Sequence, residues 1–207
     1  MDDDRRALGQ TPWQTVGPFF HYALPWPGGA DLAGTSDAGA RADLVPAEHF
    51  LLLARQPGAV AGEVIEILGR VTDGAGEPVP DALVEIWQAD ALGAYEPDDG
   101  AFPRFGRAAT ADDGGFRFRT IRPGRVAGPG NTLQAAHVAV GVLGRGLLKR
   151  LVTRLYFEGE PGLDEDPILA LAPKDRQATL IARRVGPTSY RFDIVLQGEG
   201  ETVFFDC

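Results

Sequence analysis

Histidine and cysteine, the side chains that most often bind metals or act as nucleophiles, are scarce in this sequence. The three histidines are His21, His49 and His137, and no two of them lie at a spacing typical of metal ligands. The single cysteine is Cys207, which excludes a disulfide framework and a cysteine-rich zinc site within the chain. The 29 acidic residues offer many carboxylate pairs, but no pair stands out for general acid–base catalysis.

Sequence motifs for phosphate binding and acyl transfer are absent. There is no G-x-x-x-x-G-K-[ST] phosphate loop and no G-x-S-x-G nucleophile turn. The glycines from Gly141 to Gly146 read G-x-x-G-x-G, which is not the dinucleotide-binding spacing. With 20 basic residues, 29 acidic residues and a net charge of −9, the chain also lacks the basic balance of a nucleic-acid-binding protein.

A series of short motifs is more informative in combination than any one of them alone. The series comprises Glu85-Ile86-Trp87-Gln88-Ala89-Asp90, Gly93-Ala94-Tyr95, Phe105-Gly106-Arg107, Arg122-Pro123-Gly124, Ala136-His137, Tyr156-Phe157-Glu158-Gly159 and Tyr190-Arg191-Phe192-Asp193-Ile194. In the residues of these motifs and in their order, the chain resembles the intradiol ring-cleavage dioxygenases over nearly its whole length. The resemblance implies the β-sandwich fold of that family.

The resemblance also implies where a metal site would lie. Catalytic chains of this family hold Fe(III) with two tyrosines and two histidines, because phenolates are hard oxygen donors and the ion acts as a Lewis acid on a bound catecholate. Tyr95 and His137 match the first tyrosine and the first histidine, but Arg125 and Ala139 stand where the second of each belongs. We call these four residues the vestigial ligand positions. Gln134 likewise replaces an arginine. The chain alone is therefore expected to bind no metal and to contribute no catalytic residue.

The family includes two-chain enzymes, and the resemblance is to their non-catalytic α chain. It implies a homologous catalytic β subunit as partner, with Fe(III) bound by that partner, and protocatechuate and O₂ as substrates. The residues that match the α chain's contribution to the substrate pocket are Thr15, Gly17, Pro18 and Arg145. A cation in such a pocket suits a substrate that carries a carboxylate.

Several of these residues also have purely structural interpretations. Tyr95 would be a sheet tyrosine with a satisfied hydroxyl, His137 a buried and hydrogen-bonded strand histidine, and Arg145 a solvated loop arginine. Two other functions stay open. One is a β-sandwich binding or scaffold module that lost the dioxygenase chemistry. The other is a self-sufficient enzyme that adds Tyr156 or His49 to the remaining donors on a different metal.

The elements that must position these residues are predicted to be strands. Segments with period-two alternation, separated by turn residues, cover residues 64–71, 82–88, 116–119, 136–142, 151–157, 190–196 and 202–205. The hairpin turn Asp112-Asp113-Gly114-Gly115 precedes one of them. One short helix is predicted over residues 174–184, between a proline and a glycine. The pattern favours an all-β sandwich, with Trp87 and Tyr190 in its core.

Residues 1–45 are rich in Gly, Pro, Asp and Ala, and are predicted to form an extended arm of the same unit as a β-sandwich over residues 46–207. Its four aromatic residues between Trp13 and Tyr22 would each cost roughly 1.5–3 kcal/mol if left in water. We therefore expect this arm to pack on its own domain or on a neighbouring subunit. Neither a secretory signal nor a long apolar run is present, which predicts a soluble cytoplasmic protein without membrane contact.

Overall fold

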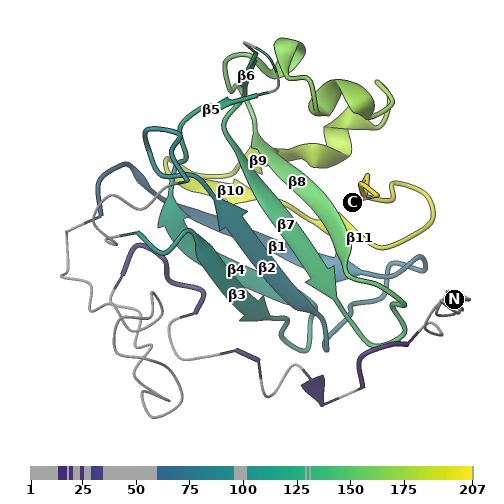
Figure 1. Cartoon of the computed structure of the whole chain (residues 1–207). Coiled ribbons are helices and arrows are strands. Elements are labelled where there is room, and N and C mark those ends of the chain that lie inside the picture. The colour runs from purple at the N-terminus through teal and green to yellow at the C-terminus, as the bar shows by residue number, and fades with distance from the viewer. Residues whose placement is uncertain are drawn as a thin grey trace, which may run out of the picture.

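A computed structural model describes residues 14–17, 19–20, 24–25, 29–34, 60–95, 102–128, 130 and 132–206. Its strands are β1 (Val64–Thr72), β2 (Leu83–Gln88), β3 (Phe105–Ala109), β4 (Gly115–Ile121), β5 (Val126–Ala127), β6 (Leu133–Gln134), β7 (His137–Leu143), β8 (Leu151–Phe157), β9 (Ile181–Arg184), β10 (Ser189–Arg191) and β11 (Ile194–Val195). Short 3-10 helices are η2 (Leu163–Glu165), η3 (Leu169–Leu171) and η4 (Gln177–Leu180) (Figure 1). No helix within the described ranges has the length and apolar character needed to cross a membrane.

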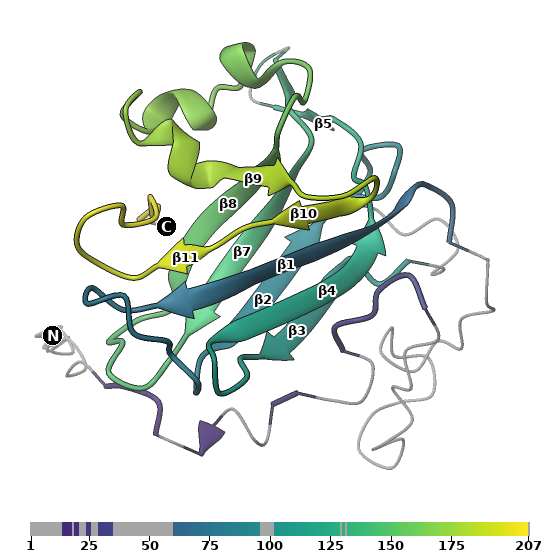
Figure 2. The ribbon, with the colours of Figure 1, turned by 180° about the vertical axis from the view of Figure 1, so that it is seen from behind.

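The strands form two layers that are joined through β9. In one layer β1 pairs with β4 on one edge and with β10 and β11 on the other, and β10 pairs with β9. The other layer has the order β3-β2-β7-β8-β9. Figure 2 shows β1, β4 and β10 in front of β2, β7 and β8. The predicted all-β sandwich is confirmed.

Side chains along each strand point alternately to the two faces of its layer, and one of these faces lies in the core between the layers. Ile65 and Ile67 of β1 and Val138 and Val140 of β7 are buried there. Branched aliphatic side chains at every second position suit a strand with one buried face. The intervening residues of β2, β7 and β8 therefore lie on the outward face of their layer.

A second, smaller core covers part of that outward face. It is centred on Tyr156 of β8, which packs with Leu169 and Leu180 from the 3-10 helices. Figure 1 shows these helices beside the ends of β8 and β9. The remaining outward face of β2 and β7 carries the residues that the sequence singled out.

A short part of the N-terminal arm is built into the sandwich through backbone hydrogen bonds. The Arg119 nitrogen donates to the Ala30 oxygen at 2.8 Å, and the Leu32 nitrogen donates to the Arg119 oxygen at 2.7 Å. The Arg107 nitrogen donates to the Gly29 oxygen at 2.9 Å. Leu32 is only 1% exposed and belongs to the main core. This part of the arm is therefore fixed against β3 and β4.

The helix predicted over residues 174–184 is wrong in its extent. The structure has only the four-residue η4, after which the chain becomes strand β9. Ile181 lies opposite Tyr156, because the edge of β8 is available for parallel pairing. Sheet pairing thus overrides the local signals that predicted a longer helix.

The strand predicted over residues 190–196 is two short strands instead. Between β10 and β11 the Asp193 carboxylate accepts a hydrogen bond from the Arg70 nitrogen at 3.1 Å, where a ladder bond would continue. The segment 202–205 makes one isolated bridge, between Phe205 and Val152. Strand β3, which pairs with β2, was not predicted.

Leu32→Ala is expected to lower the free energy of unfolding by about 2–4 kcal/mol, because it empties a fully buried site in the main core. Leu92→Ala is the matched control, since Leu92 is 89% exposed and its truncation should change stability by less than about 0.5 kcal/mol. Urea denaturation followed by circular dichroism measures both. Equal stabilities for the two variants would contradict the inclusion of the arm in the core.

Candidate functional site

An outward row of side chains crosses β2, β7 and β8. Trp87 lies opposite Ala139, and Ala139 lies opposite Arg154 in the antiparallel registers. Such partners share one face of a sheet, with Cβ atoms about 5 Å apart. Because Val138 points into the main core, this row lies on the other face. Trp87 is therefore 43% exposed, not a core residue as predicted, whereas Tyr190 is buried.

Tyr95 extends this row beyond β2. Its ring stacks on Trp87, with a centroid separation of 6.0 Å and an interplanar angle of 7°. Tyr95 lies in the loop after β2, so it is not a sheet tyrosine. Burial raises the pKa of its hydroxyl, and the positive charge of Arg154 partly opposes that rise. The phenol is therefore protonated at neutral pH.

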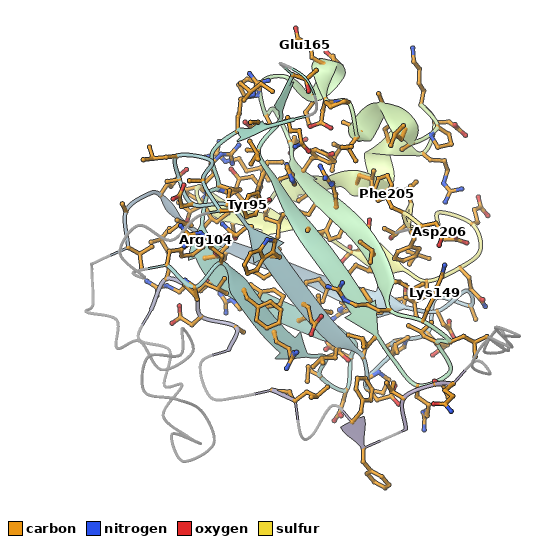
Figure 3. The ribbon with its side chains drawn as sticks, viewed as in Figure 1. Tyr95, Arg104, Lys149, Glu165, Phe205 and Asp206 are labelled. Atoms are coloured by element: carbon orange, nitrogen blue, oxygen red, sulfur yellow. The ribbon has the colours of Figure 1, made fainter. Side chains whose placement is uncertain are left out.

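Asp90 fixes the loop that carries Tyr95. Its Oδ1 accepts hydrogen bonds from the nitrogens of Leu92 and Ala94, each at 2.9 Å, and its Oδ2 lies 3.3 Å from the Arg104 guanidinium. Arg104 is buried and has a φ of 60°, a conformation that costs a non-glycine residue on the order of 1–3 kcal/mol. Figure 3 shows Tyr95 and Arg104 beside each other at one end of the sheet.

Contact between two loops brings Arg125 close to the Tyr95 loop. A Cβ atom on Gly93, whose φ is +84°, would lie 1.9 Å from the Arg125 oxygen. A Cβ atom on Gly124 would lie 2.5 Å from the Gly93 nitrogen. Both motif glycines are therefore required by the close approach of the two backbones. The Arg125 guanidinium donates to the Leu133 oxygen at 3.2 Å.

His137 is buried at the start of β7. Its Nδ1 lies 2.8 Å from the Ala135 oxygen, so Nδ1 carries the proton and Nε2 keeps its lone pair. Burial lowers the pKa of His137 and the charge of Arg154 acts in the same direction, while the hydrogen bond to the Ala135 oxygen and the negative charge of Asp166 oppose that shift. The ring is neutral at neutral pH. It matches the structural interpretation of a buried, hydrogen-bonded strand histidine.

The carboxylate of Asp166 joins this region to the second core. Asp166 is fully buried, and its Oδ2 accepts a hydrogen bond from the Ala135 nitrogen at 2.8 Å. Its Oδ1 accepts from the Tyr156 hydroxyl at 3.0 Å and from the nitrogens of Ile168 and Leu169 at 2.9 and 2.8 Å. Burial, followed by the negative charge of Asp166, raises the pKa of Tyr156. Tyr156 is thus a neutral hydrogen-bond donor and does not supply the phenolate of a self-sufficient metal site.

Arg154 is the charged residue of the outward row. Its Nη1 donates to Gln134 Oε1 at 2.7 Å, and Gln134 Nε2 donates in turn to the Ala127 oxygen at 3.1 Å. Its charge acts on both Tyr95 and His137, so the guanidinium lies among the vestigial ligand positions. Nothing in the sequence singles out this residue, since a single strand arginine forms no motif.

The ferric ligand set of the family does not fit these side chains. Tyr95 and His137 could each offer one donor atom, but Ala139 offers none and Arg125 carries only hydrogen-bond donors. Arg154 adds a positive charge that would repel a bound cation. Within the part of the chain that the structure describes, no group of three or more His, Cys, Asp or Glu is arranged to hold a metal ion. We assign no catalytic step to a metal on this chain.

The arm residues with an implied pocket role lie against the loop that follows β7. The Gly146 nitrogen donates to Thr15 Oγ1 at 3.0 Å. Arg145 is exposed in the same loop, and Gly17 is exposed with nothing within 4 Å of its Cβ direction. We call Thr15, Gly17 and residues 144–146 the arm–loop surface. Pro18 lies outside the described residues.

The arm–loop surface and the vestigial ligand positions lie at opposite ends of β7. This strand runs from His137 to Leu143, so at about 3.3 Å per residue its ends are about 20 Å apart. Figure 3 shows Lys149, in the loop after β7, far along the sheet from Tyr95. The two groups of predicted site residues therefore belong to two separate places.

Two of the four arm aromatics fall within the described residues. Phe19 is 75% exposed, while Phe20 is half-buried and its nitrogen donates to the Gly17 oxygen at 3.3 Å. Trp13 and Tyr22 lie outside the description. Packing of this aromatic segment on its own domain or on a neighbour therefore stays a prediction.

A groove of about 1020 Å³ lies on the other layer, between the arm and strands β1 and β4. It is lined by opposite charges that form exposed ion pairs, namely Arg70–Asp113, Arg117–Glu66 and Arg119–Asp31. None of the predicted site residues that the structure describes lines it. We regard it as a surface groove, since exposed ion pairs satisfy its charges and no chemistry-bearing group is unpaired in it.

Comparison with known proteins identifies the class to which this sandwich belongs. The family model Dioxygenase_C, described as Dioxygenase, matches residues 40–198. The chain belongs to the intradiol ring-cleavage dioxygenase family, as its motifs indicated.

Individual relatives match between about two thirds and nearly all of the chain. It is 40% identical to the protocatechuate 3,4-dioxygenase alpha chain of Burkholderia cepacia, over 97% of this chain and 98% of that one. It is 38% identical to the corresponding beta chain of that organism, over 77% of this chain and 76% of that one. Among solved structures, the dioxygenase domain of a dioxygenase carbohydrate-binding fusion from Streptomyces sp. SirexAA-E has a TM-score of 0.54 and 33% identity, over 68% of this chain and 84% of that one.

Asp166→Asn is expected to lower the free energy of unfolding by about 2–3 kcal/mol. The amide nitrogen replaces one acceptor oxygen and leaves a buried backbone N–H or the Tyr156 hydroxyl without an acceptor. Asp175→Asn, at an exposed position, is the control and should change stability by less than about 0.5 kcal/mol. Chemical denaturation measures both, and an unchanged midpoint for Asp166→Asn would refute this assignment.

Proposed function

We propose that this chain is the α subunit of a protocatechuate 3,4-dioxygenase. It assembles with a homologous, iron-bearing β subunit and completes that subunit's substrate pocket. The complex cleaves 3,4-dihydroxybenzoate between its two hydroxylated carbons, and both oxygen atoms of O₂ enter the product, 3-carboxy-cis,cis-muconate. Chemistry at the metal belongs to the partner, and this chain contributes binding groups.

The observation that carries the proposal is the separation of the two groups of predicted site residues. The vestigial ligand positions lack two donors, whereas the arm and the loop after β7 are held together by the bond from Gly146 to Thr15. A chain that served its own metal would need its binding groups beside Tyr95 and His137, not about 20 Å along β7. Matching to the alpha chain over nearly full length, against three-quarters for the beta chain, supports the same assignment.

Arg145 is the residue of the arm–loop surface with the most specific chemistry. Its side chain is 63% exposed, and its Nε lies 3.0 Å from a carboxylate oxygen of Asp81. That contact orients the guanidinium and leaves its other N–H groups for a further partner. A guanidinium fixed at one edge suits bidentate recognition of a carboxylate such as that of protocatechuate.

Expression of the chain alone and together with a four-ligand β chain tests the assembly. We expect no ring cleavage by the chain alone, and a co-purifying complex that consumes protocatechuate and O₂ in equal amounts. Stoichiometric iron and full activity from the isolated chain would refute the subunit assignment. Failure of every such β chain to co-purify would favour the alternative of a scaffold module without a catalytic partner.

Arg145→Ala, measured in the complex with the β chain, is expected to raise KM for protocatechuate about tenfold, because one charge-assisted interaction is lost. The value of kcat should change less than about twofold, because this residue touches no reacting atom. Catechol, which has no carboxylate, should show no change in KM. Arg183→Ala, at an exposed arginine of β9, is the control. An equal loss with both substrates would indicate a structural role for Arg145.

A further inference from the structure

We infer that Arg154 is a resident cation that takes the place of a metal ion on this chain. Its guanidinium, fixed by Gln134 beside Tyr95, His137 and Ala139, excludes metal cations even where a missing donor is restored. The inference concerns the chain's own outward face and does not depend on the β partner proposed above. It separates two causes of metal loss, deletion of ligands and occupation by a fixed positive charge.

Arg154 lies beside a position that lacks a metal donor. Arg154 stands directly across the β7–β8 ladder from Ala139, the vestigial position that lacks a second imidazole. Directly paired residues project from the same face with Cβ atoms about 5 Å apart. A histidine at position 139 would therefore project beside the Arg154 side chain. His137, two residues earlier on β7, shares this face.

Hydrogen bonds hold the Arg154 guanidinium in place. Gln134 accepts its Nη1 hydrogen bond at 2.7 Å and is itself tied to the Ala127 oxygen at 3.1 Å. Gln134 belongs to β6, which pairs with β5 directly after Arg125. The arginine therefore connects two of the segments that carry vestigial positions. A partly buried arginine in such a network does not simply swing aside for an ion.

The guanidinium of Arg154 also lacks a directly paired carboxylate among the described residues. Among the described residues no carboxylate forms an ion pair with Arg154, whereas Arg107 and Arg150, also near this face, are both paired with Glu85. The charge of Arg154 acts on the Tyr95 phenol, the His137 imidazole and the Tyr156 phenol, and the Asp166 carboxylate lies behind the Tyr156 hydroxyl, which donates to it at 3.0 Å. A positive charge without a direct counter-ion in partly buried surroundings acts strongly over short distances. It favours anionic or neutral neighbours and disfavours a second cation.

Metal binding by variants with one restored imidazole tests this inference. Ala139→His gives a His-x-His pair on one face of β7, and the combination A139H/R154Q removes the neighbouring charge by replacing the guanidinium with a shorter, neutral amide. We expect A139H/R154Q to bind Co(II) at least about tenfold more tightly than A139H, because the local repulsion is gone. Isothermal titration and the visible absorption of bound Co(II) measure the affinities.

The control A139H/R183Q has the same net charge as A139H/R154Q, but loses an exposed arginine of β9. It should bind Co(II) as weakly as A139H. Equal affinity of A139H and A139H/R154Q, whether both are tight or both are weak, overturns the inference. Equal gains from R154Q and R183Q also overturn it, since they would reflect net charge and not position. Circular dichroism verifies folding, and Ala139→Asp with and without R154Q repeats the comparison if the histidine variants do not fold.

A second readout uses the full ligand set. R125Y/A139H restores the residue types of the family's ferric site, and R125Y/A139H/R154Q adds removal of the charge. Only the triple variant is expected to hold Fe(III) through dialysis and to show a tyrosinate-to-iron absorption band. A band of equal strength in the double variant would contradict the role of Arg154. Because no β chain is present, these results do not depend on the subunit assignment.

Discussion

The antiparallel register of β7 with β2 and β8 determines what this chain can do. It places Trp87, Ala139 and Arg154 in one row and turns His137 to the same outward face. A shift of one residue would exchange this face with the valines of the main core. The Tyr95 loop, the Arg125 loop and the second core around Tyr156 are all arranged around this fixed row. The vestigial ligand positions are thus placed by the sheet and its loops, and two of them carry no metal donor.

Charge on this face follows from burial and from one arginine. Burial keeps the Tyr95 phenol protonated and the His137 imidazole neutral, and Arg154 supplies the positive charge. At an effective dielectric constant of about 20, a unit charge and a trivalent ion about 6 Å apart repel by roughly 8 kcal/mol. This repulsion opposes whatever affinity the two remaining donors would have for the ion. The hydrogen bonds of Gln134 and Asp166 stabilise the face without a metal.

Strand alternation and turn residues predicted most of the main ladder, because burial of one face repeats every second residue. They did not predict β3, because this strand depends on its pairing with β2. They also did not predict the break between β10 and β11, because there the Asp193 side chain accepts the hydrogen bond of the Arg70 nitrogen. The vestigial positions were identifiable only through the motifs that resemble the family, and two glycines of these motifs, Gly93 and Gly124, serve a contact that tolerates no side chain. Arg154 and Asp166 were not identifiable from the sequence. The role of Arg154 arises from cross-strand pairing, and that of Asp166 from a buried hydrogen-bond network.

Under the proposed function, the length of β7 lets this chain lack metal donors at one end and contact another chain at the other. Groups that complete a neighbour's pocket must project outward, and Arg145 and Thr15 do so at the end of β7 remote from His137. Their placement depends on the sandwich and on the contact between arm and loop, not on donors at positions 125 and 139. Under the proposed function, selection on this chain therefore maintains the ladder and the loop but not the ligands. A cation such as Arg154 is then tolerated at the unused end, since it has a fixed hydrogen-bond partner and faces no resident ion.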